Sequence, residues 1–101
     1  MWHCSATFSS NATLLCKVGG VVRLGEVIET LERQYDPSWA EPWDAVGLVC
    51  GDPAAEVGRV HVAVDAVAAT AEEAVAAGAQ LLVTHHPLYL RGTTSVAATT
   101  S

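Results

Sequence analysis

Residues 60–87 read VHVAVDAVAATAEEAVAAGAQLLVTHHP and contain the pattern that decides the fold. Val60–Val64 is a short apolar run typical of a buried strand, and Leu81–Thr84 is a second such run. Thr70–Ala77, between them, has the composition of a helix. A strand, a helix and a strand in close succession form a βαβ unit, whose crossover is nearly always right-handed and makes the strands parallel. The sequence therefore predicts an α/β fold, with a parallel or mixed sheet flanked by helices.

The ends of this helix carry recognisable signals. Thr70 is the predicted N-cap, and Glu73 stands three residues later, at the capping-box position. Gly78 follows the last helical residue and is predicted to end the helix.

Potential metal ligands follow both predicted strands. Asp65 comes directly after the first strand, and His85 and His86 come directly after the second. Parallel strands end at the same edge of a sheet, which is where open α/β proteins bind their ligands. Imidazole is the commonest metal ligand and carboxylate is a usual partner, so His85 and His86 are the predicted metal ligands. These donors suit zinc, manganese, iron or nickel and do not choose among them.

The two histidines are adjacent, and adjacent side chains of an extended chain point in opposite directions. We therefore expect each histidine to serve a different ion, in a two-metal site. Pro87 favours an extended conformation at His86, and Thr84 is a candidate partner that orients an imidazole. Asp65 could be a ligand, a hydrogen-bond partner of a histidine or a cap of the next segment, and we favour the last two.

Upstream of this unit, Leu24–Tyr35 carries apolar residues at helical spacing and charged residues on its other face, which predicts an amphipathic helix. A loop follows, and its Trp39 and Trp43 are predicted to pin it to the core, with a stacking platform for a ring as the alternative. Val46–Cys50 is predicted to be a short strand, in which Cys50 behaves as a small buried hydrophobe.

The domain organisation follows from composition. Residues 1–22 are rich in Ser and Thr and lack a period, so we expect a disordered extension there. Residues 23–101 form one α/β domain. His61 lies inside a predicted strand and is expected to be a packed or sheet-face residue, while His3 belongs to the extension, so neither is a predicted ligand.

The charge and the cysteines argue against several classes of protein. The formal net charge is -6, and all eleven acidic residues lie after Leu24, so the chain offers no basic stripe for nucleic acid. No apolar run is long enough to span a membrane, and no secretory signal is evident. Three widely spaced cysteines without a CxxC pair suggest free thiols in a reducing compartment, so a cytoplasmic location is expected.

Four motifs in this order and spacing resemble one family: Trp43–Leu48, Gly51–Pro53, Val62–Asp65 and Thr84–Leu88. They are similar to the N-terminal part of the GTP cyclohydrolase I type 2 homologues, also called the Nif-three-like dinuclear metal-centre proteins. The resemblance covers residues 24 to about 99. It implies that residues 23–101 are the N-terminal portion of a Nif-three-like α/β metal-binding domain.

The resemblance also implies a homohexameric ring, with two divalent metal ions held per subunit. The paired histidines of the family's THHP motif are metal ligands and correspond to His85 and His86. The family's remaining ligands, an Asp, a His and a Glu, lie farther downstream than this sequence extends, so we expect a fragment of the family fold. The sequence departs from the family at Ala45, where the family usually has Asn.

Three functions remain open at this point, and no catalytic residue is assigned. The first is a dinuclear metal-dependent hydrolase, GTP cyclohydrolase-like by resemblance only, in the full-length form. The second is a non-enzymatic metal-binding or interaction scaffold with protein partners. The third is an inactive truncated fragment.

Overall fold

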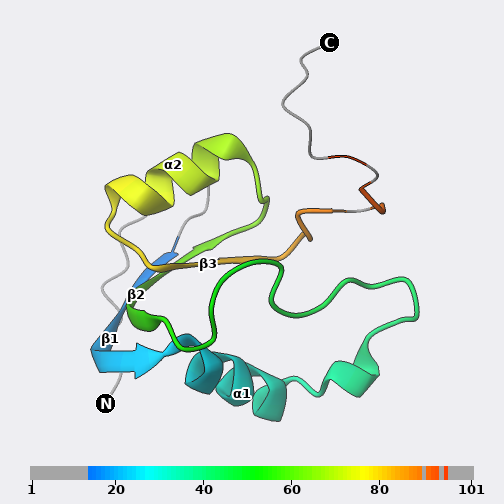
Figure 1. Cartoon of the computed structure of the whole chain (residues 1–101), viewed down its shortest axis with the longest axis horizontal. Coiled ribbons are helices and arrows are strands. Elements are labelled where there is room, and N and C mark those ends of the chain that lie inside the picture. The colour runs from blue at the N-terminus through cyan, green and yellow to red at the C-terminus, as the bar shows by residue number, and fades with distance from the viewer. Residues whose placement is uncertain (1–13, 90, 94, 96–101) are drawn as a thin grey trace.

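The computed structural model describes residues 14–89, 91–93 and 95, and its elements form one short α/β arrangement (Figure 1). Residues 1–13, with His3 and Cys4, lie outside the described residues, as do residues 96–101. The elements are β1 (Leu14–Arg23), α1 (Leu24–Gln34), a 3-10 turn (Pro37–Trp39), β2 (Glu56–Ala63), α2 (Ala68–Ala76) and β3 (Leu81–Thr84). Neither helix in the described part of the chain is long and apolar enough to cross a membrane.

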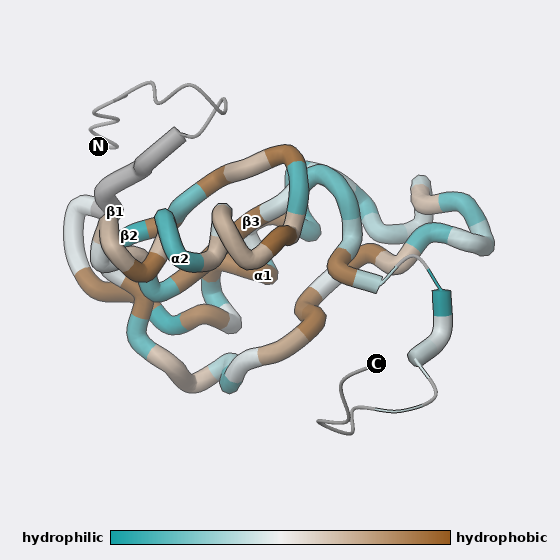
Figure 2. The backbone as a smooth tube through the Cα atoms, turned by 90° about the horizontal axis from the view of Figure 1, so that it is seen from above, coloured by the Kyte–Doolittle hydropathy of each residue, from teal (hydrophilic) through white to brown (hydrophobic). Residues whose placement is uncertain are grey.

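The three strands form a mixed sheet in the order β1-β2-β3. β2 and β3 are parallel, with Val60 opposite Leu81 and Ala63 opposite Thr84. α2 connects them and lies over the sheet, as the views from the front and from above both show (Figure 2). The predicted α/β class and the parallel βαβ unit are therefore confirmed.

β1 is the main difference from the sequence prediction. It pairs antiparallel with β2 and includes residues 14–22, which the sequence assigned to a disordered extension. The stretch LLCKVGGVVR is rich in β-branched and aliphatic residues, and it adds to an edge of β2 that would otherwise be left unpaired. The register shifts between Lys17 and Val22, a stretch that contains the Gly19-Gly20 pair.

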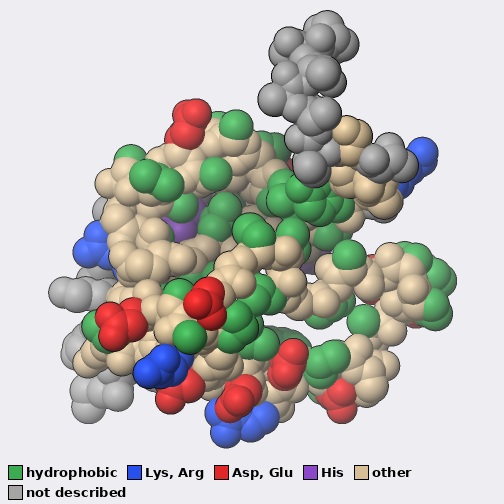
Figure 3. Space-filling view, in the orientation of Figure 1, with side chains coloured by type: hydrophobic (Ala, Val, Ile, Leu, Met, Phe, Trp, Pro, Cys, Tyr) green, Lys and Arg blue, Asp and Glu red, His purple; other side chains and the backbone are tan. Residues whose placement is uncertain are grey.

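α1 begins and ends as the amphipathic pattern predicts. Glu26 accepts a hydrogen bond from the Arg23 backbone N–H at 2.8 Å, which satisfies a donor at the helix start. Leu24 is buried, and acidic and basic side chains gather over the outer side of the helix (Figure 3). The helix ends ahead of Asp36, whose carboxylate accepts a bond from the Ser38 N–H. The hydrogen bond from the Ser38 backbone lowers the pKa of the Asp36 carboxyl.

α2 begins two residues earlier than predicted. Its N-cap is Val67, and Thr70 occupies the third helical position, so the prediction of Thr70 as N-cap is wrong. Gly78 has a φ of +69°, the left-handed conformation that ends helices, so the predicted stop is correct. Arg59 of β2 donates to the carbonyl of Ala77, which fastens this end of α2 to the sheet.

The loop between α1 and β2 also differs from expectation. Val46–Cys50 forms no strand, because Gly47 adopts a φ of +117° and Gly51 a φ of +128°, which interrupt an extended backbone. Trp39 and Trp43 are 73% and 78% exposed, so the prediction that they pin the loop to a core is wrong in the described structure. Cys50 is likewise exposed rather than buried.

The set of buried residues is small and contains an unusual polar residue. The buried apolar side chains among the described residues are Leu24, Val57, Ala63 and Ala74. His61 of β2 is 2% exposed, which confirms the prediction of a packed histidine. Within the described part of the chain, neither of its ring nitrogens has a hydrogen-bond partner.

The buried ring of His61 leads to a stability prediction. Unpaired buried polar atoms cost about 1 to 3 kcal/mol, and leucine is an apolar side chain of similar size. His61→Leu is therefore expected to raise the free energy of unfolding in urea by an amount of this order. His61→Gln keeps a polar group at the site and serves as the control. A leucine variant no more stable than wild type, or equal to the glutamine variant, would contradict this account of His61.

Candidate metal centre

The candidate site lies just beyond the ends of β2 and β3. Backbone pairing continues past the strands, because the His85 N–H donates to the carbonyl of Ala63 at 3.2 Å and the His86 N–H donates to that of Val64 at 2.9 Å. This pairing fixes the chain after β3 alongside the chain after β2. It brings Asp65 next to His86, although 21 positions separate them in the sequence.

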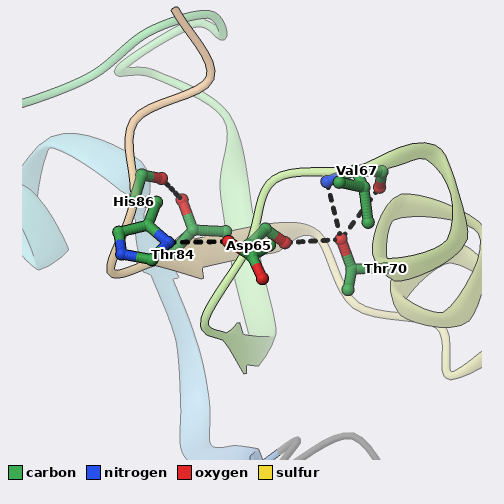
Figure 4. A network of polar contacts seen from close by, with 5 residues as sticks. All are labelled: Asp65, Val67, Thr70, Thr84 and His86. Atoms are coloured by element: carbon green, nitrogen blue, oxygen red, sulfur yellow. Dashed lines mark hydrogen bonds and ion pairs between the residues drawn. The ribbon is translucent and has the colours of Figure 1, made fainter. Parts of the chain in front are cut away.

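The Asp65–His86 pair is the central contact of the site (Figure 4). Nδ1 of His86 lies 2.6 Å from Oδ1 of Asp65. An ionised carboxylate only accepts hydrogen bonds, so a hydrogen bond between an ionised Asp65 and this atom requires the proton on Nδ1. In a neutral ring this leaves a lone pair on Nε2, the arrangement found in metal-bound histidines that are oriented by a carboxylate. Both side chains are more than half exposed, so Nε2 is accessible to an ion from solvent.

His85 lies beside His86 rather than pointing away from it. The two ring centroids are 4.9 Å apart, with the ring planes tilted by 49°. We had expected the side chains to diverge, as in a strand, but β3 ends at Thr84 and both histidines lie in a bend. The alternation of an extended chain therefore does not apply to them, and the structure brings both imidazoles into one neighbourhood.

Thr84 contacts His86 through the backbone. Its hydroxyl donates to the carbonyl of His86 at 2.8 Å, so its contact with His86 is not the predicted bond to an imidazole ring. This bond closes the bend that follows β3. Thr84 thus influences the orientation of His86 by holding its main chain.

An open groove of about 1170 Å³ passes over the two histidines. Its lining also includes Trp43, Asp44, Tyr89 and Arg91, which combine two aromatic rings, a carboxylate and a guanidinium. Trp43 is exposed and lines this groove, and its alternative role as a stacking platform stays a prediction. Sequence reasoning did not select Tyr89 or Arg91, because single residues in a loop carry no spacing signal.

The imidazoles of His85 and His86 and the carboxylate of Asp65 are chemically suitable ligands for a divalent metal, but they are few. Imidazole nitrogens and a carboxylate are typical ligands of zinc, manganese, iron and nickel. In residues 14–89, 91–93 and 95, however, no group of three or more His, Cys, Asp or Glu side chains is arranged to hold an ion. Catalytic zinc normally has three protein ligands. His85 and His86 therefore offer two ligands, with Asp65 already bonded to one of them.

The chain was compared with protein families, known proteins and solved structures. The model of the family described as Duf34/NIF3 (NGG1p interacting factor 3) matches residues 22–101. A Streptomyces coelicolor protein named GTP cyclohydrolase 1 type 2 homolog is 62% identical over 78 residues, which cover 77% of this chain and 27% of the relative. A Mycobacterium tuberculosis protein of the same name is 53% identical over 79 residues, covering 78% of this chain and 20% of the relative.

A less similar relative carries the same name and is matched over a similar part of its length. A Staphylococcus aureus protein, also named GTP cyclohydrolase 1 type 2 homolog, is 35% identical over 77 residues, covering 76% of this chain and 21% of the relative. The chain thus spans little more than a quarter, or less, of the length of these relatives. No solved structure matches the chain.

Proposed function

The chain belongs to the Duf34/NIF3 family, and from this premise we propose that it contributes His85 and His86 to a divalent-metal centre of that family. The family resemblance described from the THHP motif assigns both residues as ligands. The remaining ligands of a complete centre would come from parts of the family fold outside this sequence.

The observation that carries this proposal is the hydrogen bond between Asp65 and His86. A lone histidine pair at a protein surface is weak support for a metal site. A histidine whose Nδ1 lies 2.6 Å from a carboxylate has a ring whose orientation that contact restrains. That arrangement supports a role of His86 as a ligand and of Asp65 as the residue that orients it.

Two divalent ions per subunit fit the family, and the proximity of the two rings suits neighbouring ions or a shared one. When bound, such ions lower the pKa of a coordinated water and stabilise charge on an oxygen-rich substrate. In this chain, His85 and His86 would hold the metal, Asp65 would orient His86, and Trp43 and Arg91 would contact whatever enters the groove. We propose metal-dependent hydrolysis for the full-length form only, following the name that the relatives carry.

A non-enzymatic scaffold is the second candidate, and exposed apolar surface favours it. Large apolar side chains are well exposed in several elements, including Tyr35, Trp39, Trp43, Val46 and Val75. Further polypeptide that packed against these side chains would remove their apolar surface from water. A homohexamer in the cytoplasm, with protein partners, is the form we propose by family resemblance. A stable ring in light scattering without turnover would favour this candidate.

Calorimetric titration tests the metal proposal. The purified chain is titrated with zinc, manganese, nickel and, without oxygen, ferrous ions. We expect saturable binding of at least one of these ions at a molar ratio near one or two. The absence of saturable binding for all four would contradict the proposal for this chain. A parallel screen of nucleotides and phosphoesters with the loaded protein tests hydrolysis separately.

A further inference from the structure

We propose that Thr70 of α2 is the positioning residue that holds Asp65 in place against His86. Thr70 is not near the histidines in the sequence, and it is not a candidate ligand. The expected effect of Thr70 on metal affinity rests on the function proposed above. Its expected effect on the orientation of the His86 ring does not.

The hydroxyl of Thr70 closes the turn that follows β2. Oγ1 lies 2.8 Å from the carbonyl oxygen of Asp65 and 2.8 Å from that of Val67, and it accepts the Val67 N–H at 3.1 Å. A hydroxyl has one hydrogen to donate, so the two carbonyls share it, while a lone pair takes the N–H. One side chain therefore ties together both ends of the segment 65–67.

Burial distinguishes Thr70 from the residues that it holds. Thr70 is 7% exposed, whereas the side chains of Asp65 and His86 are 60% and 55% exposed. An exposed carboxylate is free to leave a histidine unless its backbone is fixed, because ordering both side chains costs conformational entropy. The bond from the buried Thr70 to the Asp65 carbonyl supplies that constraint.

The network reaches His86 from two directions (Figure 4). Thr70 fixes the main chain of Asp65, whose carboxylate then holds the His86 ring at Nδ1. Thr84 holds the His86 carbonyl from the other strand. The ring and the main chain of His86 are thus fixed by different residues, and removing Thr70 is expected to release the ring alone.

The test measures which ring nitrogen of His86 carries the proton, in metal-free protein and at a pH where the ring is neutral. Heteronuclear NMR of the ring nitrogens reports this tautomer without depending on exchange of the proton. In wild type we expect the Nδ1–H form to dominate. Thr70→Val keeps the shape and removes the hydroxyl, and it is expected to shift His86 towards the Nε2–H form. Thr70→Ser keeps the hydroxyl and is expected to restore the wild-type tautomer.

Matched controls separate positioning from stability. Thr30 in α1 also donates its hydroxyl to a helix carbonyl, that of Glu26 at 2.8 Å, so Thr30→Val is the same change away from the site. It is expected to leave the His86 tautomer unchanged. Thr70→Ala answers the same question if Thr70→Val does not fold. A folded variant without the hydroxyl that keeps the wild-type tautomer overturns the proposal.

Metal affinity gives the second readout. Loss of the Thr70 hydroxyl is expected to weaken metal binding by about 10-fold. This is the lower end of the loss in affinity that follows when a residue that orients a metal ligand is replaced. Thr70→Ser is expected to keep the wild-type affinity. A tautomer that responds to Thr70 in a chain that binds no metal would support the positioning role and contradict the proposed function. If the chain bound metal, but neither the His86 tautomer nor the metal affinity changed when Thr70 lost its hydroxyl, the proposed function would be supported and the positioning role contradicted.

Discussion

Replacing His85 and His86 together by alanine is expected to weaken divalent-metal binding by at least about 100-fold, the upper end of what is lost when only an orienting partner is removed. The two imidazoles are the only ligands proposed within this sequence. Their ring centroids lie 4.9 Å apart, so one substitution alone would leave a neighbouring donor in reach. Calorimetric titration of the double variant, with the ion that binds wild type most tightly, measures the loss.

His61→Leu is the matched control for this experiment. It also removes a histidine, but one that is buried in β2 and does not line the groove. Its metal affinity is expected to equal that of wild type. If the double alanine variant kept wild-type affinity while folded, the ions would be bound elsewhere and the assignment of the two histidines would fail.

Asp65→Asn is expected to weaken metal binding by about 10- to 100-fold, while the fold is retained. Asparagine preserves the shape of the side chain and can still accept a hydrogen bond from Nδ1 of His86. It lacks the negative charge that strengthens the hydrogen bond from Nδ1–H, and its amide group can also donate to Nδ1, so it holds the ring less specifically. Titration calorimetry measures the affinity, and circular dichroism verifies the helical content.

The control for Asp65 is Asp36→Asn. Asp36 is also an exposed carboxylate with a hydrogen bond, from the Ser38 N–H at 2.8 Å, but it lies at the end of α1 and does not line the groove. We expect this variant to bind metal as wild type does. An Asp65 variant within about twofold of wild type would mean that the carboxylate does not act on the metal ligand, contrary to the usual effect of such partners.

The sequence predicted the βαβ unit and, through it, the meeting of Asp65 with the histidines. Both inferences use rules that hold for any parallel pair of strands, namely a buried apolar run and a shared carboxyl edge. The preference for Asp65 as a partner or cap, rather than a ligand, agrees with its bond to His86. Whether that bond serves a metal stays a prediction.

The failures concern features that the residue type alone does not determine. Thr70 has the residue type of an N-cap, and only the path of the chain after β2 makes its hydroxyl close the turn at Asp65 instead. Val46–Cys50 is apolar enough for a strand, but glycines in the left-handed region interrupt it. Trp39 and Trp43 are apolar by type, and residue type alone does not determine which partner covers them.

The directions of the two imidazoles could not be predicted, although the end of β3 at Thr84 was predicted correctly. The expectation treated His85 and His86 as extended residues, whose side chains alternate. The structure places both in a bend after Thr84, with the ring centroids 4.9 Å apart. The bend depends on the path of the main chain after the strand, which the hydrophobic pattern does not specify.

The most direct test of the central claim is the metal content per chain, by elemental analysis of the purified protein beside its His85→Ala, His86→Ala variant. The account predicts zinc, manganese, iron or nickel at a near-stoichiometric level in the unaltered chain and its loss in the variant. Equal metal in both proteins, or none in the unaltered chain after exposure to these ions, would contradict a metal centre built on His85 and His86.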